Sequence, residues 1–178
     1  QTLCRKFDDD QRWLIALISD TGLRLAEAAG LLVSDINLHC PIPYVDIKPH
    51  PWRRLKTISS ARKVPLIGAS LWAAQRICET VDGAYAFSRY CSEERTKANS
   101  ASGALNKWLH THISNQSVIH SFRHSFRDRL RAVECPSDIS DALGGWSAKG
   151  IGQRYGEGYK LNIKHQWISK IEMLRSLD

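Results

Sequence analysis

The chain has 178 residues, of which 43% are hydrophobic and 24% are charged, a composition typical of one globular domain with its own core. This composition excludes a disordered chain, a collagen-like chain and a disulfide-stapled mini-protein. The formal net charge of +7 and the sequence pI of about 9.3 favour a polyanionic partner, without singling out nucleic acid.

Several sequence signals bear on the location of the protein. No apolar run approaches the roughly 20 residues that a membrane-spanning helix needs, and no secretory signal pattern is present. The five cysteines are odd in number and form no C-x-x-C pair, which favours reduced thiols. We therefore expect a cytoplasmic protein without a membrane partner. Because the chain begins with Gln1 instead of Met, we expect it to be a fragment of a longer protein.

The first elements along the chain are predicted to be helices. The acidic start of residues 8–19 suits a helix N-terminus, and the apolar residues of this segment share one face. A second helix is predicted from Leu23 to about Leu32, with Thr21 as its N-cap. Residues 41–67 then carry five prolines and short β-favouring pieces. They predict a small antiparallel sheet with turns near His50 and Ser59-Ser60.

Helical periodicity returns in the rest of the chain. The helix predicted over His120–Val133 is basic and carries an apolar stripe at steps of 4, 4 and 3 residues. The last helix, predicted over 162–177, either docks on a neighbouring protomer or packs on its own domain. Other helices are predicted over Ser70–Val81, Ala101–His112 and Asp138–Leu143. The pattern predicts one domain over 1–178 that is mainly α with a small antiparallel β-sheet, an α+β fold.

Short motifs that carry functional side chains follow one another along this framework. None of them is specific alone, but their order and spacing together are. The motifs are Gly22-Leu23-Arg24-Leu25-Ala26-Glu27, then His120-Ser121-Phe122-Arg123, then Leu143-Gly144-Gly145-Trp146, with Tyr155 nine residues after the last. Between the first and the second motif lies the string K-T-I-S-S-A-R-K-V-P-L, from Lys56 to Leu66.

The residue types in these motifs suit phosphoryl transfer on DNA. Such a reaction needs a nucleophile, positive charge at the non-bridging oxygens and a proton donor for the leaving oxygen. A guanidinium group is always charged and grips phosphate with two N–H groups, so we expect Arg24 and Arg123 to hold the phosphate. His120 lies three residues before Arg123, and the two side chains are expected on one helix face.

With these motifs in this order, the chain resembles the catalytic domain of the tyrosine recombinase (phage integrase) family over about residues 8–175. The resemblance implies the fold of DNA breaking-rejoining enzymes. It implies site-specific cutting and rejoining of double-stranded DNA through a 3′-phosphotyrosyl intermediate, without metal or other cofactor, by four protomers in a bacterial cell that carries a prophage or another mobile element. It also implies an N-terminal DNA-clamping domain that is absent from this chain.

The resemblance assigns Tyr155 as the nucleophile, because the family's tyrosine usually follows a His or Trp by about nine residues. Tyr159, thirteen residues after Trp146, is the alternative. A tyrosine with its ordinary pKa near 10 needs help to lose its proton, and His120 is the expected base or phosphate partner. Lys56 is the expected general acid for the leaving 5′ oxygen.

Other assignments keep an alternative. Lys48 and Lys63 are rivals of Lys56. The indole N–H of Trp146 can donate to a phosphate oxygen but cannot shuttle a proton, and packing is its alternative role. Glu27 is interpreted as a structural ion pair of Arg24. Contacts with DNA are expected from Arg62, Arg127 and Arg131, although the last two are also explained as surface residues of a basic helix.

Other functional classes remain as alternatives. His120 and His124 have the i,i+4 spacing of metal ligands, but Ser121 stands where a zinc hydrolase has Glu, and Arg123 would repel a cation. No metal site is therefore expected. A type IB topoisomerase or a dimer resolvase would share the tyrosine chemistry. A DNA-binding module that has lost catalysis would bind DNA and form no covalent adduct.

Overall fold

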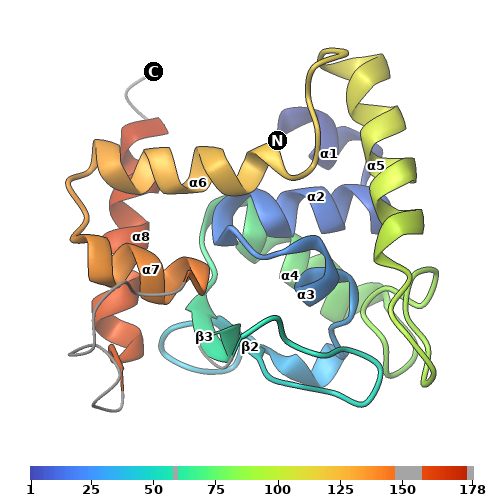
Figure 1. The fold of residues 1–178 in the computed structure, drawn as a ribbon, viewed down its shortest axis with the longest axis horizontal. Coiled ribbons are helices and arrows are strands. Elements are labelled where there is room, and N and C mark those ends of the chain that lie inside the picture. Colours follow the sequence, from blue (N-terminus) through green and yellow to red (C-terminus); the bar gives the residue numbers. More distant parts are fainter. Residues whose placement is uncertain (58–59, 147–157, 176–178) are drawn as a thin grey trace.

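A computed structural model describes residues 1–57, 60–146 and 158–175. Residues 174 and 175 are described by their backbone alone. In these ranges the chain forms eight α-helices, one short 3-10 helix η1 (Val33–Asp35) and one three-stranded antiparallel sheet (Figure 1). Helices surround the sheet on several sides, so that the predicted mainly α architecture with a small antiparallel sheet is confirmed.

The helix α2 (Asp10–Thr21) forms the centre of the molecule. It begins after Asp9, whose side chain accepts a hydrogen bond from the backbone N–H of Arg12 at 3.0 Å. It ends at Gly22, whose φ of +62° lies in the left-handed region that glycine adopts without steric cost. Residues 12–21 are all buried, because other helices pack around α2: α1 (Thr2–Phe7), α3 (Leu25–Ala29), α4 (Gly68–Thr80) and α6 (Ser121–Ala132).

The second helix is shorter than predicted and has a different N-cap. α3 covers only five residues and begins after Arg24, while the Thr21 hydroxyl donates to the Leu17 carbonyl within α2 at 2.6 Å. The chain after α3 pairs with a distant segment, where the Ala86 N–H donates to the Leu31 carbonyl at 3.0 Å. The helix itself ends at Ala29, with Gly30 as its C-cap. The short helix α1 was not predicted.

The sheet consists of β1 (Ile36–Asn37), β2 (Tyr44–Ile47) and β3 (Arg62–Pro65) in the order β1-β2-β3. Val45 pairs with Val64 in the centre, and both side chains are buried. The predicted turn near His50 is confirmed by two backbone hydrogen bonds between His50 and Arg53. Lys56 and Thr57 belong to the connection between β2 and β3, so the K-T part of the string is not a strand. Residues 58–59 lie outside the described ranges.

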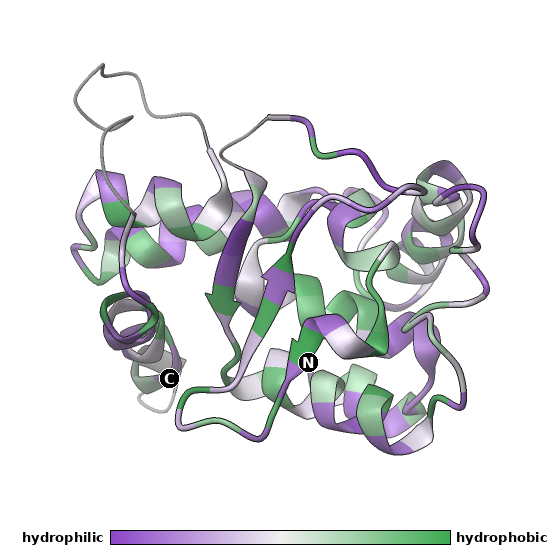
Figure 2. Cartoon of the chain, turned by 90° about the horizontal axis from the view of Figure 1, so that it is seen from below, coloured by the Kyte–Doolittle hydropathy of each residue, from purple (hydrophilic) through white to green (hydrophobic). Residues whose placement is uncertain are grey.

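The C-terminal half supplies α5 (Ala98–His112), α6, α7 (Ser137–Gly144) and α8 (Leu161–Arg175). The predicted apolar stripe of α6 packs on the core, with Phe126 and Leu130 fully buried. α8 packs on β3 and α6 through Ile168 and Ile171, so one of its faces is covered by its own chain. Apolar and polar residues alternate along these helices (Figure 2). None of the described helices combines the length and apolarity needed to cross a membrane.

Candidate active site

Arg24 occupies the start of α3 and links three segments of the chain. Its Nη1 donates to Glu27 Oε1 at 2.6 Å and to Ser60 Oγ at 3.0 Å, and its Nη2 donates to the carbonyl of Gly145 at 2.9 Å. The backbone N–H of Arg24 donates to the second oxygen of Glu27 at 3.0 Å. The expected ion pair with Glu27 is confirmed. The side chain of Arg24 keeps 23% of its surface exposed, so it is accessible to a ligand.

Glu27 is the buried carboxylate that joins two arginines. Its Oε2 also accepts a hydrogen bond from Arg62 Nη2 at 3.0 Å. Burial alone would raise the pKa of Glu27, but the charge of Arg62 and the hydrogen bonds from Arg62 and Arg24 bring it below its ordinary value. Glu27 is therefore an ionised anchor that holds both guanidinium groups in place.

Arg62 differs from its expected place on a DNA-contacting surface. Its side chain is only 3% exposed, and its guanidinium donates to the Leu143 carbonyl at 2.8 Å and the Ser60 carbonyl at 2.6 Å. The reason lies in β3, where side chains alternate between faces and Arg62 shares the inner face with Val64 while Lys63 faces out. Arg62 therefore does not present its charge to the outside in this structure.

Arg123 is also buried, with 5% of its surface exposed, although it lies in the first turn of α6. Its Nη1 donates to the carbonyl of Gly22, whereas its buried Nη2 has no hydrogen-bond partner among the described residues. Burial and then the charges of Arg24 and Arg62 lower the pKa of Arg123 to about 10. A buried, unpartnered cationic N–H group is costly, and an anion bound here would satisfy it.

A cavity of about 230 Å³ lies beside Arg123. The α2–α3 junction and the N-terminal end of α5 form its walls, and His120 lines it together with Arg123. Burial, followed by the charges of His124, Arg123 and Arg24, lowers the pKa of His120 below its ordinary value. His120 is therefore neutral at physiological pH, the state in which an imidazole accepts a proton.

Trp146 packs against the arginines of α6. The centre of its ring lies 4.5 Å from the guanidinium carbon of Arg123 and 4.8 Å from that of Arg127, within the range of cation–π attraction. A Cβ atom at Gly144 would lie 2.0 Å from the ring, so the glycine makes room for it. This arrangement favours the packing role of Trp146, and its donation to a phosphate stays a prediction.

The three candidate lysines have different surroundings. Lys48 forms an ion pair with Asp35 at 3.1 Å, and the ammonium of Lys63 lies 4.9 Å above the ring of Tyr44. Lys56 is exposed, and none of the hydrogen bonds or ion pairs found within the described ranges involves its ammonium group. Its neighbour Thr57 lies 3.0 Å from Ser60, oxygen to oxygen, which places Lys56 near the group that binds Arg24.

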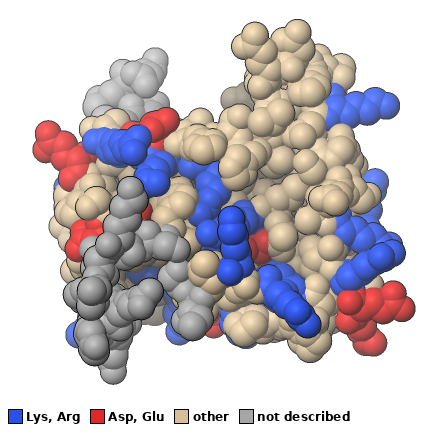
Figure 3. All heavy atoms as spheres, in the orientation of Figure 1, with Lys and Arg blue, Asp and Glu red and all other residues tan. Residues whose placement is uncertain are grey.

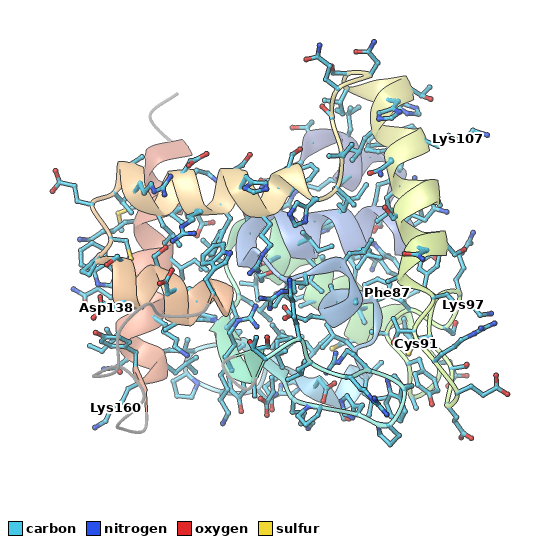
Figure 4. All side chains as sticks on the ribbon, viewed as in Figure 1. Phe87, Cys91, Lys97, Lys107, Asp138 and Lys160 are labelled. Carbon is cyan, nitrogen blue, oxygen red and sulfur yellow. The ribbon has the colours of Figure 1, made fainter. Side chains whose placement is uncertain are left out.

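Of the two candidate tyrosines, Tyr155 lies outside the described residues. The Tyr159 hydroxyl donates a hydrogen bond to Asp138, the residue labelled at the start of α7 in Figure 4. This bond raises the pKa of Tyr159 above its ordinary value. A hydroxyl that is bound to a carboxylate and harder to ionise is the poorer nucleophile, so the structure gives no reason to prefer Tyr159.

The sequence model of the phage integrase family matches residues 2–161. The chain belongs to the phage integrase family. Membership implies a tyrosine recombinase-type enzyme whose substrate is DNA and which serves DNA recombination or integration, and the helical architecture with its small sheet agrees with the catalytic-domain fold of this family. Searches of curated proteins and of solved structures each gave no match.

Further arginines of this phage integrase domain follow Arg123 along α6 at steps of four residues. Arg127 donates to Asp141 at 3.1 Å, and Arg131 pairs with Asp128 at 3.1 Å with 67% of its side chain exposed. Lys and Arg side chains gather across the middle of the face shown in Figure 3. Exposed positions such as Arg131 are suited to contact a polyanion, which stays a prediction.

Arg53 supports the site although the sequence gives no sign of it. Its side chain is buried, and it donates to the backbone carbonyls of Glu27 and Lys48, each at 2.6 Å. Burial lowers the pKa of Arg53 despite the nearby charge of Asp35. The neighbouring Arg54 is exposed, and only the turn between His50 and Arg53 decides which of the two arginines faces inward.

The histidines and cysteines of the described ranges form no group of the kind that holds a metal ion. Across the part of the chain that the structure describes, no three His, Cys, Asp or Glu side chains come together in such a group. His120 and His124 contact each other edge to face, with 4.9 Å between ring centroids. The nearest charges that lower the pKa of His120 are cationic, and they would repel a bound cation.

Proposed function

We propose that the chain is a site-specific DNA recombinase that cuts and rejoins double-stranded DNA through a 3′-phosphotyrosyl intermediate, with Tyr155 as its nucleophile. The observation that carries the proposal is the buried Nη2 of Arg123, which has no partner among the described residues and belongs to a side chain lining the cavity of His120. A DNA phosphate is an anion that would satisfy this group.

In the proposed reaction the scissile phosphate lies between the guanidinium groups of Arg123 and Arg24. The charges of these two residues both lower the pKa of His120, so the three side chains lie near enough to interact electrostatically. Two guanidinium groups can hold both non-bridging oxygens and stabilise the charge of the transition state. Arg24 would exchange part of its present hydrogen bonding for the phosphate.

The bond changes follow from this placement. The Tyr155 oxygen attacks the phosphorus, its proton passes to neutral His120, and the bond from phosphorus to the 5′ oxygen breaks. Lys56 gives a proton to the departing 5′ oxygen, which leaves a free 5′-hydroxyl. A 5′-hydroxyl of the partner duplex then attacks the phosphotyrosine and gives its proton to Lys56, while the bond from phosphorus to Tyr155 breaks and the tyrosine oxygen takes its proton back from His120. The bond energy is retained throughout, so that no nucleotide cofactor is consumed. Four protomers on two duplexes would complete the exchange.

The test is covalent trapping on a nicked suicide substrate that carries the attachment core. Wild type, Tyr155→Phe and Tyr159→Phe are compared on a denaturing gel, with EDTA present to remove divalent cations. We expect an adduct with wild type and Tyr159→Phe and none with Tyr155→Phe.

Each other outcome has a definite meaning. An adduct lost only in Tyr159→Phe would keep the reaction and move the nucleophile. No adduct from wild type on a site that it demonstrably binds would mean that the chain is a DNA-binding module without catalysis. Relaxation of supercoiled DNA without strand exchange would instead place the chain with type IB topoisomerases.

A further inference from the structure

We propose that Arg62 is a positioning residue that joins the segments carrying Arg24 and Lys56 to the end of α7, the helix that precedes Tyr155 in the chain. This inference rests on the proposed function, because it concerns how those side chains are brought together. It replaces the expected DNA contact of Arg62 by a role inside the protein.

The three hydrogen bonds of Arg62 run to three different parts of the chain. Nη2 donates at 3.0 Å to Glu27 of α3, the helix that Arg24 precedes as its N-cap. Nη1 donates to the Ser60 carbonyl at 2.6 Å, four residues after Lys56. Nε donates to the Leu143 carbonyl at 2.8 Å, in the last turn of α7 and twelve residues before Tyr155.

Gly145 fits this junction because it has no side chain. Its φ is +62°, and a Cβ atom there would lie 2.6 Å from Arg62 Nη1 and 2.8 Å from its central carbon. Its carbonyl accepts the hydrogen bond of Arg24 Nη2 at 2.9 Å. The end of α7 therefore lies between two guanidinium groups, and any side chain at this position would push Arg62 away.

The guanidinium group is the chemistry that this junction requires. Its planar fork presents N–H groups in several fixed directions, whereas a lysine offers one compact ammonium that cannot reach three separated acceptors at once. Each of the three guanidinium nitrogens of Arg62 already donates to a protein acceptor, whereas Nη2 of Arg123 has none among the described residues, so a phosphate would find no unpartnered nitrogen at Arg62. The charge of Arg62 is balanced only in part by Glu27, which Arg24 shares, and it adds to the positive potential that acts on Arg123.

The experiment separates positioning from binding. Arg62→Lys and Gly145→Ala are compared with wild type, and Gly83→Ala is the control, because Gly83 also has a positive φ but a Cβ there meets nothing within 4 Å. DNA affinity is measured over a range of salt concentrations, and the rate of adduct formation is measured in single-turnover trapping. Thermal unfolding shows that each variant is folded.

We expect both site variants to bind DNA with the affinity and salt dependence of wild type. Adduct formation should slow by about 100-fold, the loss that a displacement of about 1 Å in a catalytic group produces. Gly83→Ala should cleave like wild type.

Three results would overturn the inference. A wild-type cleavage rate in folded Arg62→Lys would show that the junction is unnecessary. A salt slope reduced by about 1 in a third variant, Arg62→Gln, which removes the charge, would show that Arg62 contacts a phosphate. If Arg62→Lys does not fold, Gly145→Ala carries the test, and loss of folding in both would make the junction purely structural. Failure of wild type to form any adduct would instead defeat the proposed function, and the inference with it.

Discussion

At the scale of single residues, the site concentrates positive charge that the fold balances only in part. Arg24 and Arg62 share the carboxylate of Glu27. Arg123 is buried near both, its pKa is lowered to about 10, and its Nη2 has no partner among the described residues. A group that is costly in the free protein and useful to a bound anion is typical of a functional site.

The first prediction concerns the substitution Arg123→Met. Replacing a whole buried ion pair by apolar side chains of similar volume is often neutral or stabilising by about 1–4 kcal/mol. The guanidinium of Arg123 is buried with one nitrogen unpartnered among the described residues, so its removal likewise relieves a desolvation cost. We therefore expect the free energy of unfolding in urea to be unchanged or higher, while adduct formation on the suicide substrate is lost. A variant several kcal/mol less stable than wild type would show that Arg123 mainly holds the fold.

At the scale of elements, α8 docks on its own domain through a face that contains a buried lysine. Ile168 and Ile171 are fully buried beside Lys164, whose ammonium donates to the Lys63 carbonyl of β3 at 3.2 Å. Burial, followed by the charge of Arg62, lowers the pKa of Lys164 from 10.5 to about 8. The helix is thus held by apolar contacts against the cost of one desolvated charge.

The second prediction follows from this lysine. Below pH 8 Lys164 is charged in the folded state, and the full cost of burying that charge lowers the free energy of unfolding. Between pH 8 and 10.5 the folded chain has released a proton that the unfolded chain retains, so the wild-type stability contributed by this group rises. We expect Lys164→Met to be more stable than wild type by about 1–3 kcal/mol near pH 7, with a difference that shrinks toward pH 10.5.

Urea unfolding at several pH values checks this prediction. Lys170→Met is the matched control, because Lys170 lies on the same helix but is only half-buried, with its ammonium over the ring of Trp167. A destabilised Lys164→Met protein would mean that the hydrogen bond to β3 outweighs the cost of burying the charge. Whether the rest of α8 also contacts a neighbouring protomer stays a prediction.

At the scale of the whole molecule, the net charge of +7 and the arginines that continue from Arg123 along α6 point to a polyanionic surface as the partner. Positions 123, 127 and 131 repeat every four residues, and such positions form one row on a helix. Arg131 ends this row in an exposed ion pair with Asp128, a kind of pair that contributes little to stability. Its charge is therefore available to DNA at small cost.

The third prediction is that Arg131→Gln weakens DNA binding equally for different sequences. The slope of log affinity against log salt concentration should become less negative by about 1, as for the loss of one phosphate contact. Arg89→Gln is the control, since Arg89 is 59% exposed and pairs with Asp10, the first residue of α2. Equal slopes for Arg131→Gln and wild type would show that this end of α6 lies away from the DNA.

The sequence by itself determined the features that depend on near neighbours. Apolar periodicity gives α2, α4, α5, α6 and α7 close to where they occur, because this signal comes from residues within one or two turns. The order of the motifs was sufficient to indicate the family, and the Arg24–Glu27 pair follows from its spacing of three residues.

Only the tertiary structure decided which charged side chains lie inside. Arg62 reaches Leu143 across 81 positions, and Arg24 reaches Gly145 across 121, so no local pattern reports these bonds. The same holds for the burial of Arg53, whose guanidinium donates to the carbonyls of Glu27 and Lys48. Burying a guanidinium is favourable only where distant carbonyls and a carboxylate meet it, and that meeting exists only after the chain has folded.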